Sequence, residues 1–216
     1  MKKLLIVIAI LAAQWASAQD AKYVKAMEKT IARLDSAGGS QLGTDVLQEI
    51  YNSFERIGAA NPKEWLPLYY QAFCEIMLGM KQSENSKKDE FYDKAELLIS
   101  KADSLQPNNS EIYVMKSFVT SMKLSVDPQN RGQQLGMKSG ALLSRALQLD
   151  PENPRVYFLK GQGLLYTPEQ WGGGKPKARP VLETAIEKYS KFKPASSIAP
   201  HWGEERCRAA LEETRK

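Results

Sequence analysis

Small and large apolar residues recur along the chain in a frame that three prolines mark. Pro62, Pro107 and Pro151 lie 45 and 44 residues apart. Six residues after each proline stands a large side chain: Leu68, Tyr113 and Tyr157. Ten residues after each proline stands a small residue: Ala72, Ser117 and Gly161. A period of this length is typical of helical repeat arrays, in which neighbouring repeats bury each other's apolar faces.

The apolar spacing inside the repeats is that of amphipathic helices. In the first segment Tyr23, Met27, Ile31 and Leu34 share one helical face. No run of alternating apolar residues predicts a strand. We expect nine helices: two at 20–37 and 44–57, three A/B pairs at 65–80 with 91–105, 111–126 with 136–149 and 155–166 with 178–193, and a last helix at 201–215. The polar segment 81–90 is expected to be a connection, and its composition would also allow it to be mobile.

The residues around the third proline resemble a tetratricopeptide repeat (TPR). The segment 146–157 reads ALQLDPENPRVY and is followed by the small residue Gly161, and the stretch 95–117 is the next best match. The resemblance covers residues 62–193, and residues 20–61 more weakly. It implies an all-α fold, a right-handed α-solenoid of TPR-like helix hairpins with a C-terminal capping helix.

The repeats are longer than a TPR unit of about 34 residues. The additional ten or so residues lie between the A and B helices. They form either longer helices or longer loops, and the sequence leaves both alternatives open.

A second resemblance concerns the C-terminal part. The segments 167–175 (TPEQWGGGK) and 199–204 (APHWGE) are similar to an exported TPR-like family of Bacteroidetes-type bacteria whose function is unknown. This likeness implies a location outside the cytoplasm and does not imply a mechanism.

The first residues predict a cleaved signal peptide over residues 1–18. Lys2 and Lys3 precede a short apolar run that ends in a small-x-small site at Ala16-Ser17-Ala18. The run is shorter than the roughly 20 apolar residues that span a bilayer. We therefore expect residues 19–216 to form one exported TPR-like helical repeat domain with no transmembrane segment. The periplasm is the expected location, with full secretion as the alternative.

The charge pattern narrows the class of partner, and the cysteine positions decide whether a disulfide is expected. The net charge is +5, with acidic and basic residues mixed along the chain and no basic stripe of the kind that binds nucleic acid. Cys74 and Cys207 belong to an early and a late helix, too far apart in a solenoid for the distance of about 7 Å that a disulfide allows. Two free thiols are expected.

The residues that usually carry catalysis are few. His201 is the only histidine, which excludes a metal site with several histidine ligands. The Gly172-Gly173-Gly174-Lys175 run lacks the spacing and the preceding strand of a phosphate-binding loop. We therefore expect no enzyme activity, no metal site and no cofactor, with an enzyme of unknown type as the remaining alternative.

The candidate binding surface is the concave face of the solenoid. Fixed offsets after each proline place one apolar stripe there, formed by Tyr69, Phe73, Met77, Val114, Phe118, Met122, Phe158, Gln162 and Tyr166. Such a stripe either lines a groove or fills the packing between repeats. As a groove it predicts a module that binds a peptide or helix of a protein partner in the cell envelope. The alternative function is a carrier that holds a small apolar ligand or lipid in a closed pocket.

A secondary candidate pocket lies near the C-terminus. Trp171, Lys175, His201 and Trp202 would form it if the glycine-rich loop folds back onto the last helix. In the alternative interpretation the two tryptophans only seal the end of the solenoid. The sequence gives no oligomeric state.

Overall fold

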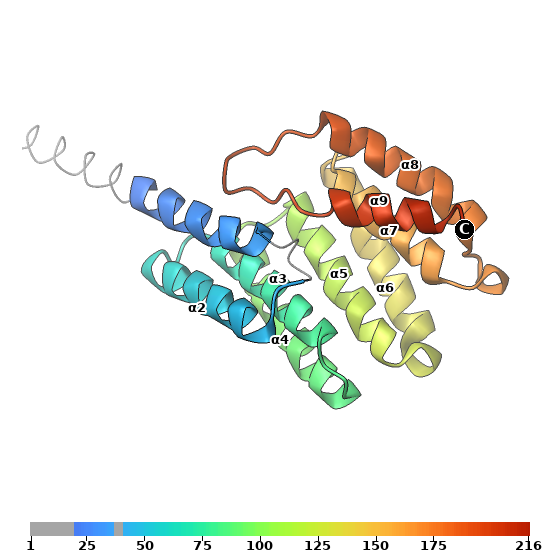
Figure 1. Cartoon of the computed structure of the whole chain (residues 1–216), viewed down its shortest axis with the longest axis horizontal. Coiled ribbons are helices and arrows are strands. Elements are labelled where there is room, and N and C mark those ends of the chain that lie inside the picture. Colours follow the sequence, from blue (N-terminus) through green and yellow to red (C-terminus); the bar gives the residue numbers. More distant parts are fainter. Residues whose placement is uncertain (1–19, 37–40) are drawn as a thin grey trace, which may run out of the picture.

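The computed structural model describes residues 20–36 and 41–216, which are α-helical with no strand (Figure 1). The predicted signal peptide, residues 1–18, lies outside the described residues. A helix at 20–35 comes first. It is followed by α2 (Thr44–Ala60), α3 (Leu66–Met80), α4 (Asn85–Leu105), α5 (Ser110–Val126), α6 (Pro128–Leu149), α7 (Pro154–Tyr166), the short 3-10 helix η1 (Glu169–Trp171), α8 (Lys175–Lys191) and α9 (Glu204–Glu213).

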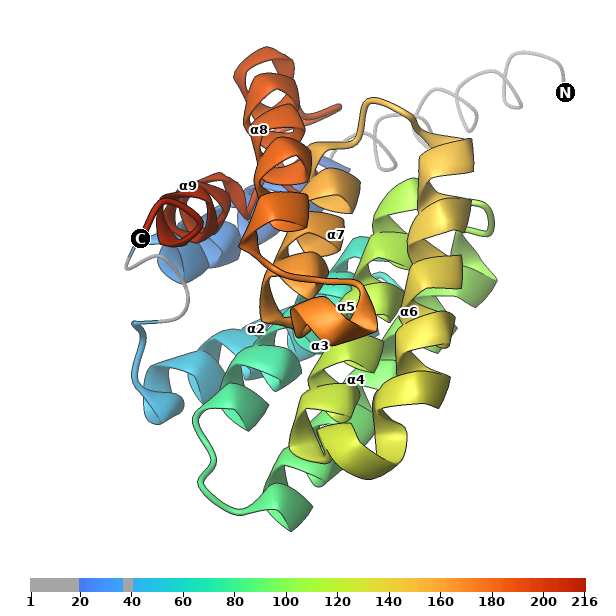
Figure 2. The same ribbon diagram turned by 90° about the vertical axis from the view of Figure 1, so that its right-hand side faces the viewer.

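Consecutive helices form antiparallel hairpins that stack side by side (Figures 1 and 2). The pairs are α3 with α4, α5 with α6, and α7 with α8, and each helix packs against the next one along the chain. The helix at 20–35 turns the predicted face inward, with Met27 fully buried. The prediction of an all-α solenoid of TPR-like hairpins is confirmed.

Asparagine caps and small residues explain the repeat pattern. Asn109 and Asn153 follow the repeat prolines by two residues, and their side chains accept hydrogen bonds from the backbone N–H of the second residue of α5 and α7. At the predicted small positions the A helix approaches the B helix closely. A Cβ atom at Gly161 would lie 2.7 Å from the Leu182 side chain of α8, so only a residue without a side chain fits there.

The additional length of the repeats lies in long B helices. α4 has 21 residues and α6 has 22 residues. The expectation that all of 81–90 is a connection is wrong, because α4 begins at Asn85, and α6 begins at Pro128 rather than at the predicted residue 136. Asp127 caps α6, and Pro128 occupies its first turn, where a missing N–H costs nothing. The Asn85 amide donates to the Val126 carbonyl at 3.1 Å, which fixes the start of α4 against the end of α5.

Residues 192–203, which we call the return segment, lead from α8 back across the solenoid toward the helix at 20–35 (Figure 1). Tyr70 donates a hydrogen bond to the Ile198 carbonyl, and the His201 ring contacts Asp35 at 2.9 Å. α9 then packs on α7 and α8 and buries Cys207, Ala210 and Leu211, so it caps the last hairpin as predicted.

The two cysteines are free, as predicted, and both are buried. Cys74 lies in α3 and Cys207 in α9. Burial raises the pKa of the Cys207 thiol to about 12 and that of Cys74 further, which keeps both thiols protonated and unreactive. Within residues 20–36 and 41–216, no helix is both apolar and long enough to cross a bilayer.

Glu75 of α3 should make stability depend on pH. Its side chain is buried, and its Oε2 atom has no hydrogen-bond partner among the described residues. Burial raises the pKa of this carboxyl to about 7, while Lys94 opposes the shift. Because the unfolded chain releases this proton near pH 4.5, the group's contribution to stability is complete below that pH and is lost as pH rises through 7.

We therefore expect Glu75→Gln to raise the free energy of unfolding by about 1–3 kcal/mol at pH 8, with little difference at pH 4.5. Urea unfolding at the two pH values measures this. An equal effect of the substitution at both would contradict an ionised, unpaired Glu75 as its cause.

Candidate functional site

Most of the predicted concave stripe is core. Six of its nine side chains are at most 6% exposed: Tyr69, Phe73, Met77, Val114, Phe118 and Phe158. For these six the structure supports the alternative in which the stripe packs repeats together. The other three, Met122, Gln162 and Tyr166, remain accessible, and Tyr166 is 63% exposed.

The stripe is buried because the return segment fills the concave face. The Trp202 ring lies between Phe73 and Phe118, at centroid distances of 5.3 and 5.7 Å. Its indole N–H donates to the Tyr69 hydroxyl at 2.8 Å. A peptide in the predicted concave groove would have to displace this tryptophan.

A buried ion pair holds the return segment in place. The Arg155 side chain is fully buried and donates to both carboxylate oxygens of Glu111, at 2.8 and 2.5 Å. Its guanidinium also lies over Phe192 and contacts the Trp202 carbonyl at 3.4 Å. Burial alone would lower the pKa of Arg155, but the adjoining Glu111 carboxylate outweighs it and the net shift is upward. Arg155 is therefore a structural cation.

An open groove of about 680 Å³ lies elsewhere, between the C-terminal halves of α5 and α7 and the middle of α6. The long B helices form part of it, since α4 contributes Lys88 and Tyr92 and α6 contributes Gly136, Ser139, Gly140 and Leu143. We call it the α5–α7 groove. Its lining residues are Met80, Lys88, Tyr92, Ser121, Met122, Leu124, Ser125, Gly136, Ser139, Gly140, Leu143, Leu159, Lys160, Gln162, Gly163, Leu164, Tyr166, Thr167 and Arg206.

The lining of the α5–α7 groove is apolar with cationic groups. Eight of its nineteen residues are leucine, methionine or tyrosine, five are serine, threonine or glutamine, three are glycine, and the charged residues are Lys88, Lys160 and Arg206. Two of its glycines border open space, because a Cβ atom at Gly140 or Gly163 would meet no other atom within 4 Å. A larger side chain at either position would extend into that space. The groove therefore suits a bulky apolar ligand that carries negative charge.

Three predicted stripe residues, Met122, Gln162 and Tyr166, line this groove. Sequence reasoning missed the contribution of α6. Its signal was present, since Gly132, Gly136 and Gly140 repeat at a spacing of four on one helical face. Glycine weakens a helix interior by roughly 0.5–1 kcal/mol relative to alanine, so a glycine series in a helix indicates a need for space.

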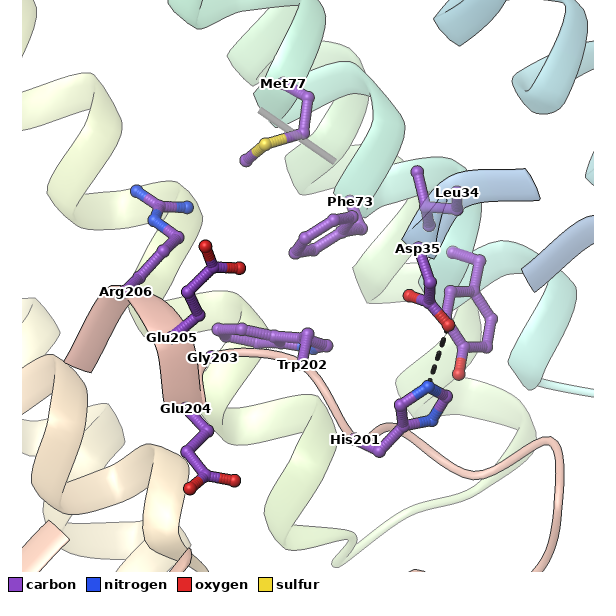
Figure 3. Close-up of a pocket in the computed structure, with 11 residues that line it drawn as sticks. Leu34, Asp35, Phe73, Met77, His201, Trp202, Gly203, Glu204, Glu205 and Arg206 are labelled. Carbon is purple, nitrogen blue, oxygen red and sulfur yellow. Dashed lines mark hydrogen bonds and ion pairs between the residues drawn. The ribbon is translucent and has the colours of Figure 1, made fainter. Parts of the chain in front are cut away.

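A second, smaller cavity of about 210 Å³ lies beside Trp202 (Figure 3). α3 contributes Phe73 and Met77, the helix at 20–35 contributes Leu34 and Asp35, and the first turn of α9 contributes Glu204, Glu205 and Arg206. The lining residue His201 is hydrogen-bonded on both sides of its ring: Nε2 contacts the Asp35 carboxylate, and Nδ1 contacts the Ala199 carbonyl. The hydrogen bond to Asp35 raises the pKa of His201 above its usual value, with burial opposing the shift.

The predicted secondary pocket does not form as one site. His201 and Trp202 line the small cavity, whereas Trp171 is 70% exposed on the loop between α7 and α8. That loop is closed by its own hydrogen bonds, including the one from the Gly174 N–H to the Leu164 carbonyl at 2.9 Å. Gly172 and Gly174 have positive φ angles of 90° and 97°, so the glycine run serves the tight turn.

Groups of three or more metal-ligating side chains are absent from the described part of the chain. The groove lining contains no histidine and no cysteine. Its candidate donors to a metal centre are the Tyr166 hydroxyl and the Met80 and Met122 thioethers. Partial burial, with Glu213 beside it, raises the pKa of Tyr166, which disfavours the phenolate, the form of tyrosine that binds a metal ion.

Two solved structures are similar to the chain. The HusA haemophore from Porphyromonas gingivalis has 37% sequence identity and a TM-score of 0.78, over 89% of this chain and 92% of that one. A thermophilic TPR protein from Thermus thermophilus has a TM-score of 0.50 over 95% of both chains. At 14% identity this second likeness concerns the fold alone. No protein-family model matches the chain, and no curated protein does.

Proposed function

Since the chain belongs to the family of the HusA haemophore, we propose that it is a porphyrin-binding protein that holds haem or a related macrocycle in the α5–α7 groove. The observation that carries the proposal is the groove itself. Its volume of about 680 Å³ lies within the range of small-molecule sites. Its apolar walls and cationic groups complement a flat apolar ring that carries carboxylates.

The groove supports binding through the macrocycle rather than through the iron. Histidine and cysteine, which are common protein ligands of haem iron, are not among its lining residues. Tyr166 is a weaker candidate because its raised pKa disfavours the phenolate. Burial of an apolar ring contributes roughly 25 cal/mol per Å² irrespective of the metal. We therefore propose that metal-free porphyrin binds nearly as well as haem.

A protein partner remains a second proposal, which the TPR-like fold supports. The predicted concave site for a peptide is occupied by Trp202, so we propose that a partner helix would use the α5–α7 groove instead. We propose further that the chain acts outside the cytoplasm without catalysing a reaction. The predicted signal peptide 1–18 and the family of the haemophore support this location.

Titration of the mature chain with haemin and with metal-free protoporphyrin IX tests the function. We expect saturable binding of one macrocycle per chain, with dissociation constants of about 1 μM or tighter that agree within about tenfold. Absorbance of the porphyrin and quenching of tryptophan fluorescence report the binding. If neither compound binds saturably, the proposal is wrong. If haemin alone binds, the iron is a required contact.

A further inference from the structure

Arg206 lines both the α5–α7 groove and the small cavity beside Trp202. It lies in the first turn of α9, and its guanidinium lies over the Phe118 ring at 5.7 Å. Figure 3 shows its side chain extending from α9 next to that of Glu205. Arg206 therefore lies between the α5–α7 groove, where the ligand would bind, and the C-terminal end of the return segment.

The guanidinium of Arg206 lacks an acceptor. Its Nη1 atom is buried, and no hydrogen bond or ion pair reaches it from the residues that the structure describes. Neighbouring arginines differ, since Arg155 is paired with Glu111 and Arg208 with Glu204. A buried donor without an acceptor is destabilising, and more so when the group is charged. Burial lowers the pKa of Arg206, but guanidinium stays charged at any physiological pH.

A carboxylate would complete this site. The planar guanidinium presents paired N–H groups that match the two oxygens of a carboxylate. Of the other groove cations, Lys160 is exposed and Lys88 is half-buried like Arg206, but both carry ammonium groups. Flexible, hydrated ammonium groups there fix an anion less firmly.

We propose that Arg206 binds a carboxylate of the ligand and so makes the groove selective for apolar ligands that carry a free acid. This inference rests on the proposed function, because it assigns one edge of the porphyrin, the edge with its carboxylates, to the α9 side of the groove. The ring then covers the α6 glycines. Esters of the same macrocycle would keep the apolar contacts and lose the anion.

The test compares protoporphyrin IX with its dimethyl ester in three proteins. These are the wild-type chain, Arg206→Met, and the matched control Arg208→Met, which removes an exposed cation of the same helix that does not line the groove. We expect the wild type to bind the free acid about 10–100-fold more tightly than the ester. Arg206→Met should lose that preference while its affinity for the ester stays unchanged. Arg208→Met should change either affinity by less than about threefold.

The ester also reports whether the Arg206→Met groove is intact, so a folding defect is recognised directly. Equal weakening of acid and ester would make Arg206 a structural residue and overturn the inference. So would a wild-type chain that binds acid and ester equally, although porphyrin binding itself would stand. If the wild type binds neither compound, the proposed function fails and the inference fails with it.

Discussion

Gly140→Trp is expected to abolish porphyrin binding without unfolding the protein. Gly140 lines the α5–α7 groove, and a Cβ atom there would meet no atom within 4 Å, so an indole ring can extend into the volume that the ligand would use. We expect the affinity to fall about 100-fold or more. Stability should not decrease, because glycine is about 1 kcal/mol less favourable than alanine in a helix interior and tryptophan lies between them.

The chain provides a matched control for this substitution. Gly132 lies two turns earlier in the same helix, and a Cβ atom there also meets nothing within 4 Å, but Gly132 does not line the groove. Gly132→Trp should therefore bind porphyrin like the wild type. Titration followed at the porphyrin absorbance band measures both variants, and thermal unfolding checks that both are folded. Equal loss in the two variants, or full binding by Gly140→Trp, would place the ligand outside this groove.

Glu111→Gln is expected to cost about 3–5 kcal/mol of stability. The substitution leaves the Arg155 guanidinium, which is fully buried, without its counter-ion. A domain of this kind is stable by only about 5–15 kcal/mol, so the loss is a large fraction of the total. Because Arg155 also contacts the Trp202 carbonyl, the return segment should loosen from the concave face first.

Urea unfolding measures this loss, with Glu152→Gln as the control. Glu152 pairs with Lys188, but its carboxylate is 77% exposed, so its removal should cost less than about 1 kcal/mol. A double variant, Glu111→Leu with Arg155→Met, should be more stable than Glu111→Gln, since it removes both charges. Similar losses from Glu111→Gln and Glu152→Gln would contradict a structural role for the buried pair.

The sequence was sufficient for the fold because its information is local and periodic. The proline frame, the small residues such as Gly161 and the helical spacing around Met27 act between neighbours in one hairpin or in adjacent hairpins. Contacts of that kind recur at fixed offsets in the chain. The same reasoning separated Cys74 from Cys207 and predicted two free thiols, which the structure confirms.

The helix boundaries inside the repeats were harder to predict from the sequence. The polar composition of 81–90 indicated a connection, yet α4 begins at Asn85. Tertiary contacts outweigh this weak local preference, because Asp89 pairs with Arg131 of α6 and Asn85 contacts the end of α5. These contacts extend α4 and α6 and thereby provide the walls of the groove.

What only the tertiary structure decided is which face of the solenoid stays open. The sequence by itself determined an all-α repeat array with an apolar stripe, of which Phe73 and Phe118 are members. It could not show that Trp202, more than 80 residues beyond Phe118, returns to fill that stripe, since no periodicity links a terminal segment to the repeats it covers. Closing the concave face there leaves the α5–α7 groove, opened by Gly140 and bordered by Arg206, as the site that we propose for the ligand.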